Sequence, residues 1–109
     1  MKYTLVIFFL ACNLEEKEEE CLATCSKIYD ECGILRPATT TQELINYCVD
    51  ECMTAMSNKG DVGSYDPYKQ IPESERPELE NDQQGTLWME CVNQTSCEDL
   101  EDNYCAPIW

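Results

Sequence analysis

The sequence predicts a small all-α protein: a disulfide-rich helical bundle built on a helical hairpin, with one long irregular loop. Nine cysteines in 109 residues are a density typical of exported chains stapled by disulfides. Two segments each carry Cys-x3-Cys within a helical stripe of apolar residues. A chain of this length also buries too little apolar surface for a large core without covalent help. We therefore expect one stapled domain in an oxidising compartment.

The first eleven residues have the proportions of a signal peptide. Met1 and Lys2 supply one positive charge, and an apolar run follows over residues 3–11. A helix that spans a bilayer needs about twenty apolar residues, so this run is too short to remain as a transmembrane segment. We therefore expect residues 1–11 to be removed during export.

The apolar run closes on Phe-Leu-Ala-Cys at residues 9–12. This ending resembles the bacterial lipobox, in which a small residue precedes a cysteine that is linked to diacylglycerol and becomes the new N-terminus. The resemblance covers residues 1–12 and departs from the family pattern at Phe9, where an aliphatic residue is usual. It implies a lipid on Cys12, with membrane lipid as a partner. It also implies a lipid-anchored location at the bacterial cell envelope, on its periplasmic or surface face; secretion is the alternative.

Cysteine parity points to the same residue. An exported protein rarely leaves one thiol unpaired, and nine is an odd number. If Cys12 bears lipid, the remaining eight cysteines can form four disulfides. Residues 12–20, which are rich in glutamate, are then expected to be an acidic tether, and residues 21–109 the stapled helical domain.

Two helices are expected in the first half of that domain. Apolar residues recur at helical spacing between residues 16 and 32, and Gly33 is well placed to end the helix. A second helix begins at Thr40-x-x-Glu43, which has the form of a capping box, and stops at residues 58–60. The two stripes consist of Cys21, Cys25, Ile28, Tyr29 and Cys32, and of Leu44, Ile45, Cys48, Cys52, Ala55 and Met56.

The two Cys-x3-Cys motifs predict how the hairpin is stapled. Cysteines four residues apart lie on the same helical face, one turn from each other. In an antiparallel pair the first cysteine of one helix faces the second of the other. The spacing therefore predicts the disulfides Cys21–Cys52 and Cys25–Cys48.

The second half of the chain is expected to contain a long loop and two short helices. Glycines and prolines interrupt residues 58–84, and no period of either kind crosses this stretch. The loop is either mobile or laid across the bundle by Tyr65 and Tyr68 with Ile71. A helix is expected over residues 86–93, and Ser96-x-x-Asp99 starts a shorter one.

Four cysteines remain for the last two disulfides. Cys32 shares the stripe of its helix but lies beyond the reach of the second helix's cysteines, so we expect it to pair with Cys91. Cys97 is then expected to pair with Cys105. Three connectivities are open for these four residues, and the sequence does not choose among them.

Two further cysteine patterns resemble known families in part. Paired Cys-x3-Cys helices are similar to helical-hairpin proteins of the mitochondrial intermembrane space, although 22 residues separate Cys25 from Cys48, more than those families use. Cys48 and Cys52, followed by 38 residues before Cys91, resemble part of the six-cysteine pattern of insect odorant-binding proteins. That resemblance implies a secreted small-molecule binder, which is the alternative function.

Charge and composition narrow the chemistry. The formal charge of −15 repels phosphate backbones, which excludes nucleic acid as a partner. The chain has no histidine and no recognisable nucleophile motif, so we expect no enzyme, no cofactor and no metal site. A thiol-redox or metal protein is a third class of function, and it predicts free thiols.

The leading expectation is a non-catalytic interaction or structural module, with Trp109, Tyr65 and Tyr68 as a candidate patch for a protein partner.

Overall fold

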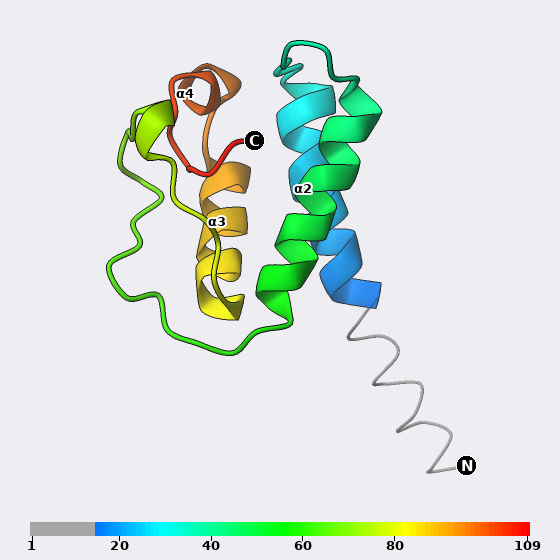
Figure 1. Ribbon diagram of the computed structural model, residues 1–109. Coiled ribbons are helices and arrows are strands. Elements are labelled where there is room, and N and C mark those ends of the chain that lie inside the picture. Colours follow the sequence, from blue (N-terminus) through cyan, green and yellow to red (C-terminus); the bar gives the residue numbers. More distant parts are fainter. Residues whose placement is uncertain (1–14) are drawn as a thin grey trace, which may run out of the picture.

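The computed structural model describes residues 15–109, and this part of the chain folds into helices joined by loops, without strands (Figure 1). The all-α, disulfide-rich class that the sequence predicts is therefore confirmed. The expected signal peptide and Cys12 lie outside the described residues. The elements are an α-helix over residues 15–26 that continues directly as the π-helix η1 (Lys27–Glu31), then α2 (Thr41–Met56), the 3-10 turn η2 (Glu73–Glu75), α3 (Asp82–Gln94) and α4 (Cys97–Glu101).

Side-chain caps determine where two of the predicted helices begin. The Thr40 hydroxyl accepts a hydrogen bond from the backbone N–H of Glu43 at 3.1 Å and donates to the Glu43 carboxylate at 3.0 Å. The Ser96 hydroxyl accepts from the backbone N–H of Asp99 at 3.2 Å and starts α4. Both predicted helix starts are confirmed.

The third helix begins four residues earlier than the sequence predicts. The Asn81 side chain accepts from the backbone N–H of Gln84 at 3.0 Å, so α3 starts at Asp82 rather than at residue 86. Gly85 faces Met56 of α2, where an added Cβ would lie 2.7 Å from the methionine sulfur. Two residues of the first turn of α3, Gln84 and Gly85, are therefore buried although neither is apolar, which hides the helix start from an apolar pattern. The irregular loop correspondingly ends at residue 81 instead of 84.

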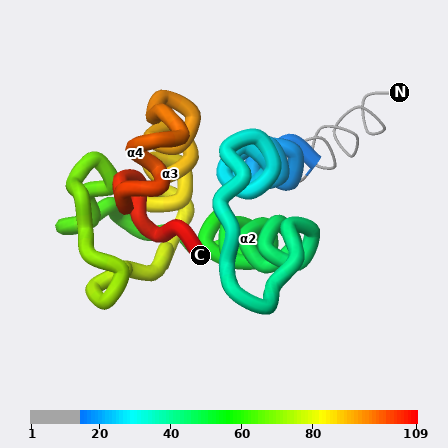
Figure 2. Tube along the Cα trace, turned by 90° about the horizontal axis from the view of Figure 1, so that it is seen from above, coloured from blue at the N-terminus to red at the C-terminus, as the bar shows by residue number. Residues whose placement is uncertain are grey.

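The three long helices run alternately up and down and pack on one another (Figure 1). The helix over residues 15–31 and α2 form the hairpin, and α3 packs against both of them, as the view from above shows (Figure 2). Burial of their facing stripes forms one core. Its fully buried side chains include Ile28, Tyr29, Trp88, Val92 and Leu100 together with six cysteines.

The long loop follows the side of α3 that faces away from the hairpin (Figure 2). Its middle is bonded to the C-terminal residues, since the backbone N–H of Cys105 donates to the Pro67 carbonyl at 2.7 Å and that of Ile71 to the Asn103 carbonyl at 3.2 Å. Near the start of the loop, the Asp61 carbonyl accepts a hydrogen bond from the Asn81 side-chain amide at 2.9 Å. Of the two alternatives left open by the sequence, the structure therefore has the packed loop.

None of the helices in residues 15–109 combines the length and apolar character needed to cross a membrane.

Candidate functional site

The hairpin disulfides match the pairing that the Cys-x3-Cys motifs predict. Cys21 is bonded to Cys52 and Cys25 to Cys48, and both pairs have Cα atoms 5.8 Å apart, within the usual range for a disulfide. All four residues are 0% exposed. The two bonds therefore lie one helical turn apart inside the hairpin.

The other two predicted pairings are wrong. The structure joins Cys32 to Cys97 and Cys91 to Cys105, in place of Cys32–Cys91 and Cys97–Cys105. Cys32 follows η1, and the wider π-helical turn moves it away from the stripe that the α-helical period assigns to it. It caps the end of the first helix, and its Cα atom lies 5.2 Å from that of Cys97, the first residue of α4.

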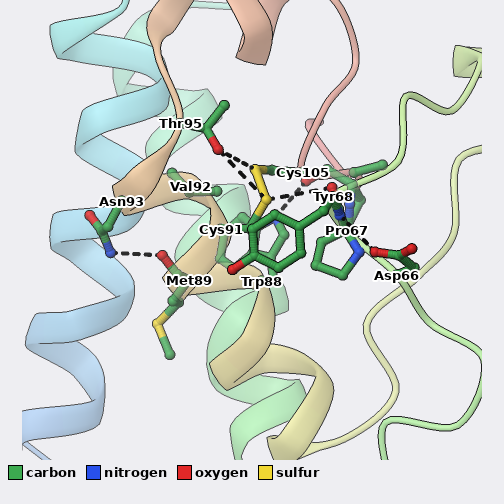
Figure 3. The surroundings of a disulfide bond; sticks show 12 residues. Asp66, Pro67, Tyr68, Trp88, Met89, Cys91, Val92, Asn93, Thr95 and Cys105 are labelled. Carbon is green, nitrogen blue, oxygen red and sulfur yellow. Dashed lines mark hydrogen bonds between the residues drawn. A yellow bond between two sulfur atoms is a disulfide. The ribbon is translucent and has the colours of Figure 1, made fainter.

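The chain reverses after α4 and brings Cys105 back to the side of α3. Asn103 and Cys105 both have positive φ, which turns the backbone, and the Ala106–Pro107 peptide bond is cis. The disulfide to Cys91 spans 14 residues and holds this reversed segment against the helix. Figure 3 shows that this disulfide lies between Thr95 on one side and the loop residues Pro67 and Tyr68 on the other.

Polar atoms at the end of α3 and in the long loop contact the buried Cys91–Cys105 disulfide. The Thr95 hydroxyl lies 3.2 Å from the sulfur of Cys105 and 3.8 Å from that of Cys91, and it is the donor because a disulfide sulfur has no proton. The Pro67 carbonyl lies 3.5 Å from the Cys91 sulfur. The disulfide is thus enclosed by α3, the loop and the C-terminal segment.

The C-terminal segment, residues 105–109, is buried along its whole length. The Tyr29 hydroxyl donates to the main-chain oxygen of Trp109 at 2.6 Å, and the Trp88 indole N–H donates to the Pro107 carbonyl at 2.9 Å. The rings of Trp88 and Trp109 meet edge to face with centroids 5.5 Å apart. These contacts fix the segment between the hairpin and α3.

Both arginines of the protein also contact this segment. Arg36 and Arg76 donate to the Ile108 carbonyl at 3.3 and 3.4 Å. Lys27 similarly donates to the Val92 and Thr95 carbonyls at the end of α3. Sequence reasoning missed these three residues because their partners are main-chain oxygens, for which no side-chain motif exists.

The predicted partner patch does not form. Trp109 is only 8% exposed, because it packs on Trp88 and on the edge of Tyr47. Tyr65 is also held inward, since its hydroxyl donates to the Ala106 carbonyl at 2.6 Å. Of the three residues, only Tyr68 is well exposed, at 46%. The terminal aromatic group therefore contributes to the core rather than to an open surface.

Burial also changes the acidity of two of these phenols. Loss of solvent raises the pKa of Tyr29 to about 12, and the Arg36 guanidinium limits the rise. Burial likewise raises the pKa of Tyr65, with a smaller contribution from the Asp66 carboxylate. Both hydroxyls thus remain protonated donors to main-chain oxygens well above neutral pH.

We expect Tyr29→Phe to weaken the fold at neutral pH and to reduce its sensitivity to alkali. The folded protein keeps a Tyr29 proton that the unfolded chain loses near pH 10, so this contribution to stability is complete below pH 10 and is lost as the pH rises to about 12. The variant lacks the hydrogen bond, which costs about 1 kcal/mol. Urea unfolding at pH 8 and pH 11, with the exposed Tyr68→Phe as control, measures both effects. An alkaline loss equal to that of wild type would contradict the assignment.

The described residues were compared with the geometry of a metal site and with that of a pocket. Within residues 15–109 there is no group of three or more histidine, cysteine, aspartate or glutamate side chains placed to hold a metal ion. Two of the surface hollows are shallow and have volumes of about 350 and 360 Å³. The second lies between the first helix and α3 and is lined mainly by polar residues, among them Ser26, Lys27 and Asp30.

Fold and framework together define a class: a small helical domain whose hairpin and C-terminal half are closed by four disulfides. Bonds of this number indicate an extracellular or otherwise oxidising compartment. Comparison with models of protein families, with curated proteins and with solved structures finds no match for the chain.

Proposed function

We propose that the protein is an exported lipoprotein of the bacterial cell envelope, anchored through Cys12, and that its folded domain is a non-catalytic interaction or structural module. The observation that supports this most is the pairing of the cysteines. All eight from Cys21 onward are bonded to one another, so the described residues leave no disulfide partner for Cys12. Lipid attachment gives that ninth cysteine a role that agrees with export.

The acyl chains and the charged residues beside Cys12 suggest how such an anchor would hold the domain. Each buried methylene of an acyl chain contributes about 0.8 kcal/mol, so two chains hold a protein stably where one does not. The helix is already formed at residue 15, three positions after Cys12, and five glutamates lie in residues 15–20. Anionic lipid headgroups would repel this turn, and the domain would stand away from the membrane surface.

The packed core of residues 15–109 supports an interaction or structural module. Ile28 and Trp88 fill the space between the helices and are both 0% exposed. A small-molecule binder with odorant-binding-like cysteine spacing needs an enclosed apolar cavity of several hundred cubic ångströms at such a place. We therefore prefer the interaction or structural module to the secreted binder.

The anchor is tested by Cys12→Ser in a bacterial host, with the neighbouring Asn13→Gln as matched control. We expect the wild type and the control to enter the detergent-rich phase of a phase-partition assay, and the C12S chain to stay in the aqueous phase. Intact mass spectrometry should find acyl chains on the first two proteins and none on the variant. Equal partitioning of all three would overturn the lipid anchor. It would leave the disulfide framework untouched.

A further inference from the structure

The four disulfides differ in how far solvent reaches them. Six of the eight bonded cysteines are buried, at 0 or 1% exposed. Cys32 and Cys97 are the two exceptions, and both are partly exposed. A thiol reagent in solution therefore meets one bond at the surface and three that the fold covers.

The exposed bond also has a distinct place in the connectivity. Two disulfides lie within the hairpin, residues 15–56. Cys91–Cys105 lies within the C-terminal half, by which we mean residues 82–109. Cys32–Cys97 alone among the four joins the hairpin to that half, across 65 residues. Within residues 15–109, breaking it leaves the chain over residues 57–81 as the covalent connection between the two halves, and each half keeps its own internal disulfides.

The other contacts between the halves are non-covalent: α3 packs on α2 and on η1, and hydrogen bonds join the first helix to the C-terminal half. Lys27 donates to the carbonyls of Val92 and Thr95, and Tyr29 donates to the main-chain oxygen of Trp109. Each such hydrogen bond contributes little net stability by itself, and somewhat more where the donor is charged. The Cys32–Cys97 bond is thus the covalent connection between the end of the first helix and the start of α4.

From this accessibility and position we propose that Cys32–Cys97 is a site of thiol–disulfide exchange with an external dithiol. A thiolate of the dithiol attacks one sulfur of the bond, forming a mixed disulfide and releasing the other sulfur as a thiolate. The second thiolate of the dithiol then attacks the mixed disulfide and releases the remaining cysteine. Two electrons pass to the protein, the two protons of the dithiol end on Cys32 and Cys97, and the dithiol becomes a disulfide.

The site is tested on the oxidised, exported protein under native conditions. Limiting dithiothreitol is added, the reaction is stopped with excess iodoacetamide, and alkylated cysteines are located by peptide mass mapping. We expect Cys32 and Cys97 to be labelled at least tenfold faster than any other cysteine. Labelling of the other six at the same rate or earlier would overturn the proposal.

A second arm uses a reduced Cys-x-x-Cys oxidoreductase as the dithiol. Labelling of Cys32 and Cys97 by the oxidoreductase assigns the exchange to protein dithiols. Labelling of this pair by dithiothreitol but not by the oxidoreductase assigns it to small dithiols. Labelling of this pair in neither arm would overturn the site.

Paired variants separate this bond from general opening of the fold. Cys32→Ala with Cys97→Ala should abolish the fast phase of labelling. Cys91→Ala with Cys105→Ala, which removes a buried bond, should keep it. If the first pair retains the fast phase, exchange begins elsewhere and the proposal is wrong. Should the second pair not fold, Cys21→Ala with Cys52→Ala is the substitute control, because Cys25–Cys48 still holds its hairpin.

Discussion

Trp88→Ala is expected to lower the free energy of unfolding by about 3 to 5 kcal/mol, the range for truncating a large aromatic side chain in a core. Trp88 is 0% exposed, donates to the Pro107 carbonyl at 2.9 Å and packs edge to face on Trp109. Truncation leaves a cavity at the contact of α3 with the C-terminal segment and also leaves a buried carbonyl without its donor. Urea unfolding followed by circular dichroism measures the loss.

Two comparisons separate these contributions. Trp88→Phe keeps most of the ring but removes the indole N–H, so we expect a smaller loss, about 1 to 3 kcal/mol. Leu35→Ala is the surface control, because Leu35 is 69% exposed, and it should change stability by less than about 0.5 kcal/mol. A Trp88→Ala loss no larger than that of the control would contradict the packing of the C-terminal segment on α3.

Removing both hairpin disulfides is expected to cost more than the sum of removing each one. The bonds are nested, so while Cys21–Cys52 is intact, Cys25–Cys48 closes only the short ring of residues 21–25 and 48–52. In the chain-entropy model each single removal, Cys21→Ala with Cys52→Ala or Cys25→Ala with Cys48→Ala, costs about 2.5 kcal/mol. Removal of both costs about 6 kcal/mol, because the whole hairpin loop then opens in the unfolded state.

The three variants and wild type form a double-mutant cycle of unfolding free energies. We expect a coupling of about 1 kcal/mol between the two bonds. Strict additivity, or single losses below about 1 kcal/mol, would contradict the nested framework.

Local chemistry made the hairpin predictable from sequence. Cysteines four residues apart share a helical face, and this alone orients Cys21 toward Cys52 and Cys25 toward Cys48. The starts of α2 and α4 were predictable for a similar reason, since Thr40 and Ser96 bond to backbone groups three residues ahead. Each of these signals depends on residues close together in the chain.

The errors arise where contacts are distant or the helical period changes. The π-helical turn of η1 moves Cys32 out of its expected register, and the pattern of apolar residues does not reveal such a turn. The start of α3 was missed because its first buried residues include Gln84 and Gly85 rather than apolar side chains. The burial of Trp109 depends on donors that lie 80 residues away, such as the Tyr29 hydroxyl.

We propose an arrangement in which eight cysteines are bonded in four pairs and the ninth bears lipid. Intact mass spectrometry of the native protein, combined with non-reducing peptide mapping, tests it most directly. We expect a mature chain that begins at Cys12 with acyl chains attached, and the pairs Cys21–Cys52, Cys25–Cys48, Cys32–Cys97 and Cys91–Cys105. A native protein that retains an unmodified Met1, or a peptide map with other pairs or alkylatable cysteine, would contradict it.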